Sequence, residues 1–169
     1  MLQLLFTIAI AGILSTLSLQ TIWHYLPIHR LDTAADCIFF HMILAKFRAI
    51  ARCEDWGLVF YDETNSFIVT KFINNDPVDH AEKLGPFPLG KGIRYGGRIR
   101  TPSRPGATTF YKDKIIFTPQ GYIRGISGAV YIADEWYKEG LKTKKNLRHR
   151  RRIVIRSMGA FINIQKSWK

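Results

Sequence analysis

Residues 1–29 read MLQLLFTIAIAGILSTLSLQTIWHYLPIH and contain no Asp, Glu, Lys or Arg. Within this stretch, the run LLFTIAIAGIL is apolar except for its threonine. Crossing the hydrocarbon core of a bilayer takes about 20 mostly apolar helical residues. Residues 1–22 supply that length, and Trp23 and Tyr25 follow where aromatic side chains would meet the lipid headgroups. The stretch therefore predicts a transmembrane helix, which we place at residues 1–28.

The alternative for the same stretch is a secretory signal peptide that is cleaved from the mature protein. A signal peptide begins with basic residues, has a shorter apolar core and ends at a small-residue cleavage site. This stretch has no basic residue ahead of its apolar run. The pattern favours a retained membrane anchor.

The helical pattern continues beyond Pro27. One apolar stripe follows at three- and four-residue spacings, and most of the charged residues lie off it. We therefore predict one helix from the N-terminus to about Cys53, bent at Pro27 because proline removes a backbone hydrogen bond. The stripe consists of Leu31, Ala34, Ala35, Ile38, Met42, Ala45 and Ala49.

Beyond the helix, the apolar pattern changes to the two-residue period of β-strands. Turn residues between the apolar runs predict antiparallel hairpins. A long helix followed by an antiparallel sheet or two is an α+β arrangement, so we expect a single folded domain over residues 29–169. The predicted hairpins are 58–61 with 67–73, 108–111 with 114–117, and 153–156 with 161–165; further strands are expected at 129–132 and 93–99, and the rest of 74–106 is expected to be loop.

The sequence offers no set of residues suited to catalysis or metal binding. Its five histidines show no i,i+3 or i,i+4 pairing that would build a metal site on a helix. Residues 76–80 are the densest acidic cluster, but they have too few oxygen ligands to favour a calcium site over a solvated loop. Cys37 and Cys53 lie about 24 Å apart along the predicted helix, too far for a disulfide. Ser157 has no lysine base after it in an apolar strand, so we interpret the chain as a non-enzyme without cofactor or metal.

Positive charge is concentrated near the C-terminal end. The net charge is +12, and residues 101–169 hold fifteen basic and four acidic side chains. Such asymmetry suggests a polyanion or an anionic surface as partner. The densest part is KTKKNLRHRRR at residues 142–152, which has seven Lys or Arg in eleven residues. These seven are Lys142, Lys144, Lys145, Arg148, Arg150, Arg151 and Arg152.

The basic run has several interpretations that the sequence leaves open. Its cations could contact nucleic-acid phosphates, and Trp136 and Tyr137 lie close enough in sequence to stack bases. A solvated loop is the commonest structure for like-charge runs and is favoured here. Contact with anionic lipid or with a neighbouring subunit would use the same charges.

The N-terminal segment LLFTIAIAGIL-x(12)-P resembles that of type IV pilins and type II secretion pseudopilins. Within that superfamily, Leu31-x-x-Ala34-Ala35 followed by AKFRAI at residues 45–50 is similar to the GspH/FimT group of minor pseudopilins. The C-terminal elements FTPQG at 117–121 and RIVI followed by Gly159 resemble the final strands of that group. The resemblance implies a pilin-like fold, in which a long N-terminal helix packs on antiparallel sheets.

Two features depart from the family pattern. Gln3 stands where a Glu is usual, and the leader peptide with its cleavage site is absent. The alignment leads us to expect that Met1 lies two residues inside the usual mature start, and that the true start codon lies further upstream.

The resemblance also implies a function. It predicts a minor pseudopilin, a structural subunit of a type II secretion pseudopilus or type IV pilus-like filament, with pilin subunits and inner-membrane lipid as partners. The expected location is the bacterial inner membrane, with a single crossing and the C-terminal domain in the periplasm. The alternative is a FimT-like minor pilin that binds DNA for uptake, but the Gly-Arg-x-Arg signature of those receptors is replaced by Gly159-Ala160-Phe161-Ile162. The helix residues implicated in membrane storage and filament assembly are Gln3, Leu4, Leu5, Gly12 and Pro27.

Overall fold

The computed structural model describes residues 2–78, 82–96, 108–125, 127–136, 148–156 and 161–166. One long helix precedes a series of strands, which confirms the predicted α+β class. The elements are α1 (Leu2–Arg52), β1 (Trp56–Tyr61), β2 (Ser66–Ile73), β3 (Asp76–Pro77), β4 (Leu84–Pro88), β5 (Ile93–Tyr95), the 3₁₀ turn η1 (Tyr111–Asp113), β6 (Lys114–Phe117), β7 (Gly128–Asp134), β8 (Arg150–Arg156) and β9 (Phe161–Gln165).

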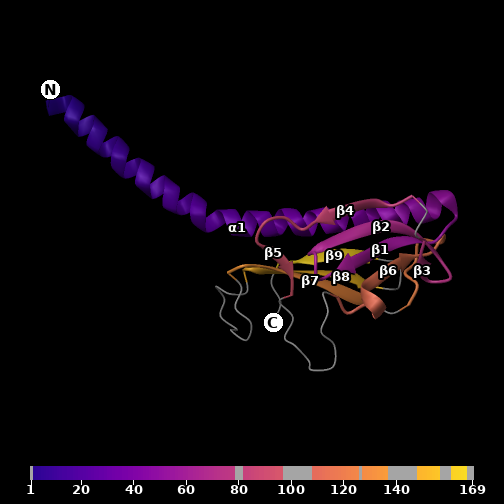
Figure 1. The fold of residues 1–169 in the computed structure, drawn as a ribbon. Helices are drawn as coiled ribbons and strands as arrows, with labels where there is room; N and C mark the ends of the chain where they lie inside the picture. The colour runs from indigo at the N-terminus through magenta and orange to yellow at the C-terminus, as the bar shows by residue number, and fades with distance from the viewer. Residues whose placement is uncertain are drawn as a thin grey trace.

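Helix α1 has two halves with different surroundings. Figure 1 shows its first part projecting away from the sheets and its second part lying along them, with a change of direction between the two. We call residues 2–28 the projecting half and residues 29–52 the packed half. Pro27 lies inside the helix near this boundary. A proline in a helix interior lacks the N–H of one backbone hydrogen bond and crowds the preceding turn, so it accounts for a bend there.

The C-terminal end of α1 is closed by backbone hydrogen bonds. Cys53 takes a left-handed conformation with φ 52, and its N–H donates to the carbonyl of Ile50 while that of Glu54 donates to Ala49. This pair of bonds is the Schellman pattern, which satisfies carbonyls that the helix itself leaves without a partner. The helix therefore ends where the sequence predicts.

The first sheet has the strand order β3-β2-β1-β6, and β4 pairs with β2 off this path. The predicted hairpin of β1 and β2 is confirmed, with Leu58 opposite Val69. The β2–β3 connection is a two-residue turn, Asn74-Asn75, in which both residues have positive φ. Asparagine favours such turns because it tolerates the left-handed conformation better than most residues.

The second sheet has the order β5-β7-β8-β9. The predicted final hairpin is confirmed as β8 and β9, with Ile153 opposite Ile164. The packed half of α1 contacts strands of both sheets, and Figure 1 shows it running along the same side of both. The helix therefore closes one side of the core that the sheets share.

The packed half supplies the apolar stripe that the sequence predicts. Every residue of the stripe is buried, and Leu31, Ile38 and Met42 are fully so. The alanines of the stripe let the sheets approach the helix closely, while each buried Leu, Ile or Met contributes about 1.5–3 kcal/mol of transfer free energy. The large side chains on the sheet side include Trp56, Phe67 and Phe117.

The predicted hairpin of 108–111 with 114–117 is wrong. Thr108 bridges to Val130 instead, and β6 pairs with β1. The reason is local: Lys112 and Asp113 have left-handed φ values of 54 and 49, which interrupt the extended chain. Thr108 Oγ1 donates to Asp113 Oδ1 at 2.7 Å and fixes the turn. The region predicted as loop also contains β3 and β4. The strand predicted at residues 93–99 is observed as β5, which ends at Tyr95; residues 97–99 lie outside the described residues.

Candidate assembly interface

The projecting half of α1 exposes large apolar side chains along its length. Phe6 is 69% exposed and Trp23 is 71% exposed. Monomeric soluble proteins rarely present contiguous apolar surface on this scale, and such surface marks contact with another protein or with a membrane. The other exposed large apolar residues of this half are Ile8, Ile10, Ile13, Leu14, Ile22, Tyr25 and Leu26.

Three hydroxyl groups of the projecting half, those of Thr7, Ser15 and Thr16, are turned back onto the helix. Thr7 Oγ1 donates to the carbonyl of Gln3, and Ser15 Oγ donates to that of Ala11, each at 2.8 Å. Thr16 Oγ1 donates to the carbonyl of Ile13 at the same distance. Because these polar groups bond within the helix, they do not need water as a partner. The helix surface at these three positions is therefore suited to an apolar environment in spite of its hydroxyl groups.

The structure places the predicted helix residues as follows. Gln3 is exposed. A Cβ built on Gly12 would have no neighbouring atom within 4 Å apart from the local backbone of the helix, so the helix surface is open at this position. The side chains of Leu4 and Leu5 lie outside the described residues. The transmembrane segment predicted at residues 1–28 is not confirmed: in the part of the chain that the structure describes, no helix is both long enough and apolar enough to cross a membrane.

The basic run is divided by the structure. Lys142, Lys144 and Lys145 lie outside the described residues, and Arg148 is exposed. The expectation of a solvated loop is wrong for the last three residues, because they belong to β8, the strand between β7 and β9. Arg150 and Arg151 are each only 4% exposed.

Arg151 connects the packed half of α1 to the second sheet. Its Nε lies 2.6 Å from Asp32 Oδ1. Its Nη1 donates to the carbonyls of Arg148 and Arg150 at 2.7 and 2.8 Å, and more weakly to Lys166 at 3.5 Å. A guanidinium presents several donors in a rigid plane, which allows one side chain to satisfy partners on three segments. Arg151 therefore holds the fold together, and it does not present its charge to a partner.

Arg152, the last residue of the run, and the nearby Trp136 also make contacts within the fold. The guanidinium of Arg152 lies 5.6 Å from the ring centre of Tyr131, a cation–π arrangement. The Trp136 ring stacks on His149, with 6.1 Å between the ring centres, and is 48% exposed. Tyr137 lies outside the described residues.

The sequence analysis missed a buried Asp–His pair that joins the end of β7 to the residue directly before β8. His149 Nδ1 lies 2.7 Å from Asp134 Oδ2, and both side chains are almost fully buried. The backbone N–H of Trp136 donates to the other carboxylate oxygen at 3.0 Å. The fifteen-residue separation gives no local signal; the pairing follows from the register that sets Ala133 opposite Arg150.

Metal-binding and thiol chemistry find little support in the described ranges. No group of three or more His, Cys, Asp or Glu within them could hold a metal ion. Asp76 of the acidic cluster pairs with Lys114 at 3.3 Å, and residues 79–80 of that cluster lie outside the description. Burial raises the pKa of the Cys37 thiol, which disfavours its reactive thiolate form.

No protein-family model and no curated protein matches the sequence. Solved structures do match the fold. The type IV minor pilin FimU of Pseudomonas aeruginosa superposes with a TM-score of 0.56 at 12% identity, covering 81% of this chain and 87% of that one. Two structures of the minor pseudopilin EpsH from the type II secretion system of Vibrio cholerae give TM-scores of 0.54 and 0.50.

The two EpsH structures share 11% and 10% identity with this chain. They cover 83% and 80% of it, and 96% of the EpsH chain in each case. At such identities the likeness concerns the fold alone. It confirms the predicted α+β architecture, in which a long N-terminal helix packs on antiparallel sheet. The chain therefore has the pilin-like α+β fold of these minor pilins and pseudopilins.

Proposed function

We propose that the chain is a minor pseudopilin, a non-enzymatic structural subunit of a type II secretion pseudopilus or a type IV pilus-like filament. The observation that carries the proposal is the projecting half of α1. A folded domain already has a complete core, yet a further 27 residues of helix extend from it with exposed Phe, Ile and Trp side chains. Such a helix needs apolar partners, and copies of the same element in other subunits provide them.

We propose that the projecting half lies in the membrane before assembly and in the core of the filament afterwards. At a rise of 1.5 Å per residue the projecting half is about 40 Å long, compared with about 30 Å for the hydrocarbon core of a bilayer. Lipid and a bundle of apolar helices are equally apolar, so transfer between them is driven by helix packing instead of by the hydrophobic effect. Ala9, Ala11 and Gly12 are small residues that allow close helix approach. We therefore propose that the subunit is held in the inner membrane before assembly, with its domain in the periplasm.

Gln3 suggests where in a filament the subunit belongs. A carboxylate at this place in related filaments can pair with a neighbouring N-terminal amine, and an unpaired charge in an apolar bundle is unfavourable. Glutamine carries no charge and needs no ionic partner. We therefore propose a position that has no such neighbour, as at the filament tip.

The alternative, a FimT-like receptor that binds DNA, has weaker support. Two arginines of the basic run are buried in β8, and the two signature arginines of such receptors are replaced by Ala160 and Ile162. DNA binding through the lysines of the run stays a prediction.

Photo-cross-linking in the producing cells tests the proposal. A photoreactive amino acid replaces Ile13, which is exposed on the projecting half, or Glu63 in the β1–β2 turn as a matched control. We expect position 13 to give adducts with chains that themselves begin with a long apolar helix, identified by mass spectrometry, and position 63 to give none of these. Assembled filaments without any protein adduct at position 13 would contradict the assembly role. Release of the full-length chain by alkaline carbonate would contradict membrane storage.

A further inference from the structure

A small cavity lies where the packed half of α1 begins. It has a volume of about 310 Å³ and opens between the first turns of the packed half and the connection from β4 to β5. Figure 1 shows this connection passing beside α1, close to the point where the helix changes direction. The cavity therefore adjoins the segment that we propose to be held in the membrane.

Two cations line this cavity from different elements. Arg30 belongs to α1, and Lys91 belongs to the β4–β5 connection. Both residues are exposed, and within the described part of the chain neither makes an ion pair. The residues that line the cavity include no Asp or Glu. The lining therefore carries two positive charges that the described part of the fold does not neutralise.

The carboxylates closest to the cavity do not cancel these charges. Asp32 is already paired with Arg151 at 2.6 Å. Asp36 is exposed on α1, and Glu135 is exposed where it approaches the β4–β5 connection. Neither of these two lines the cavity, and water and salt screen exposed charges efficiently.

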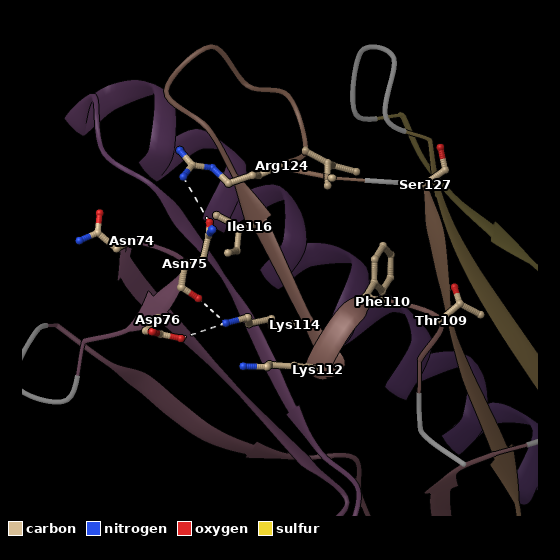
Figure 2. A pocket seen from close by; sticks show the side chains of 12 residues that line it. Asn74, Asn75, Asp76, Thr109, Phe110, Lys112, Lys114, Ile116, Arg124 and Ser127 are labelled. Carbon is tan, nitrogen blue, oxygen red and sulfur yellow. Dashed lines mark hydrogen bonds and ion pairs between the residues drawn. The ribbon is translucent and has the colours of Figure 1, made fainter. Parts of the chain in front are cut away.

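A larger cavity elsewhere in the molecule shows the contrast. It has a volume of about 740 Å³ and opens between the β2–β3 turn, β6 and the segment that leads into β7. Figure 2 shows Lys114 turned toward Asp76, and the two lie 3.3 Å apart. Arg124 of the same cavity lies 2.6 Å from Asp55. These cations are engaged within the fold, unlike those beside the start of the packed half.

The rest of the small cavity combines a polar mouth with an apolar floor. Thr33 and His29 line it, and Thr33 Oγ1 donates to the carbonyl of His29 at 3.0 Å. A hydroxyl that donates one hydrogen bond can still accept another from a ligand. Leu89 and Ile93 are buried below them. An anion would therefore bind at the mouth, between the two cations.

An apolar strip leads from the cavity along the projecting half. Trp23 and Leu26 lie seven and four residues before Arg30, and residues at these spacings share one face of a helix. Trp23 is 71% exposed and Leu26 is 43% exposed. A free phosphate leaves this strip uncovered, whereas the acyl chain of a lipid covers it. The strip therefore favours a phospholipid as the source of the anion.

We propose that the cavity binds the phosphate of an anionic phospholipid headgroup while the projecting half lies in the bilayer. Arg30 and Lys91 donate charge-assisted hydrogen bonds to the phosphate oxygens, and an acyl chain lies along Trp23 and Leu26. A zwitterionic headgroup binds less well, because its ammonium group is repelled by the same two cations. The inference rests on the proposed membrane storage and adds the class of lipid that the subunit selects there.

Native mass spectrometry of the full chain tests the proposal. The chain is released from neutral dodecyl maltoside micelles that contain equal amounts of phosphatidylglycerol and phosphatidylcholine, and the retained lipid is identified by its mass. Each basic side chain near a lipid surface favours anionic lipid by about fivefold, so we expect phosphatidylglycerol adducts to exceed phosphatidylcholine adducts by about ten- to twentyfold.

Variants of the chain localise the selectivity. Arg30→Gln and Lys91→Gln should each lower the preference for phosphatidylglycerol by about fivefold, and the double variant should bind both lipids about equally. Both positions are exposed, so neither change removes a core contact. Arg156→Gln, at an exposed position on β8 that does not line the cavity, is the matched control and should keep the wild-type preference.

Three results would overturn the proposal. The first is equal retention of both lipids by the wild-type chain. The second is a loss of preference in Arg156→Gln as large as that in Arg30→Gln. The third is displacement of phosphatidylglycerol by an equimolar amount of glycerol 1-phosphate, which would assign the cavity to a free phosphate.

Carbonate extraction separates this proposal from membrane storage itself. Arg30 and Lys91 lie outside the projecting half, so their variants should resist extraction as the wild type does. A wild-type chain that stays in the membrane but shows no lipid preference contradicts the headgroup site alone. Release of the wild-type chain by carbonate contradicts membrane storage and the headgroup site with it.

Discussion

Replacing Arg151 distinguishes a buried structural arginine from a surface cation. The sequence places this residue in a basic run that is expected to be solvated, whereas the structure buries it between α1 and the second sheet. We consider Arg151→Met, which keeps an unbranched apolar stem and removes every guanidinium donor. Arg148→Met, three residues earlier at an exposed position, is the matched control.

The contacts set the size of the expected effect. Removal of the guanidinium leaves the carbonyls of Arg148 and Arg150 without this donor and leaves Asp32 without its ion-pair partner. Hydrogen bonds to charged groups contribute about 1.5–3 kcal/mol each, and breaking a buried ion pair costs about 3–5 kcal/mol. The Asp32 side chain is 32% exposed, so water can solvate it after the loss. We therefore expect Arg151→Met to lower the free energy of unfolding by about 3 kcal/mol, at the low end for a buried pair.

Thermal unfolding followed by circular dichroism in mild detergent measures this loss. For a chain of this size, about 3 kcal/mol corresponds to a drop in Tm of about 6–12 °C. Asp32→Asn should also be destabilising, by about 3 kcal/mol, because it leaves the buried guanidinium of Arg151 without its ion-pair partner. Arg148→Met should change stability by less than about 0.5 kcal/mol. The assigned role of Arg151 is wrong if the Tm of Arg151→Met lies within about 2 °C of the wild-type value, since such a shift corresponds to about 1 kcal/mol or less. It is also wrong if Arg148→Met lowers the Tm by as much as Arg151→Met does.

Two further predictions follow from packing and burial. Gly128→Ala should lower the free energy of unfolding by about 1–3 kcal/mol, because its Cβ would overlap the Phe110 ring. Gly12→Ala, at an open position on the helix, is the control and should not lower it. An equal loss of stability in both variants would refute the packing argument. Cys53 is exposed and accessible to iodoacetamide, whereas Cys37 should be labelled more slowly because burial raises the pKa of its thiol and disfavours the reactive thiolate. Equal labelling of both in a short reaction, read by mass spectrometry, would show that Cys37 is open to solvent.

Local periodicity explains what could be predicted from the sequence. The spacing from Leu31 to Ala49 identifies the buried face of α1, because a helix repeats every 3.6 residues wherever it packs. The β1–β2 and β8–β9 hairpins were predictable for the same reason, since turn residues separate two adjacent apolar runs. The partner of β6 was not predictable in this way. It pairs with β1, more than fifty residues earlier in the chain, and no local signal encodes that choice.

The charge pattern of the sequence was the least reliable predictor of which residues are solvated, because ion pairs in this fold join distant segments of the chain. Arg151 meets Asp32 across 119 residues, and Lys114 meets Asp76 across 38. A run of like charges therefore looks solvated when its compensating carboxylate lies elsewhere in the chain. The apolar residues directly after Arg152 were the available warning: Ile153 and Ile155 belong to a central strand, and the arginines before them continue the same strand into the interior. The basic residues that directly precede such a strand are better interpreted as part of the sheet than as a binding loop.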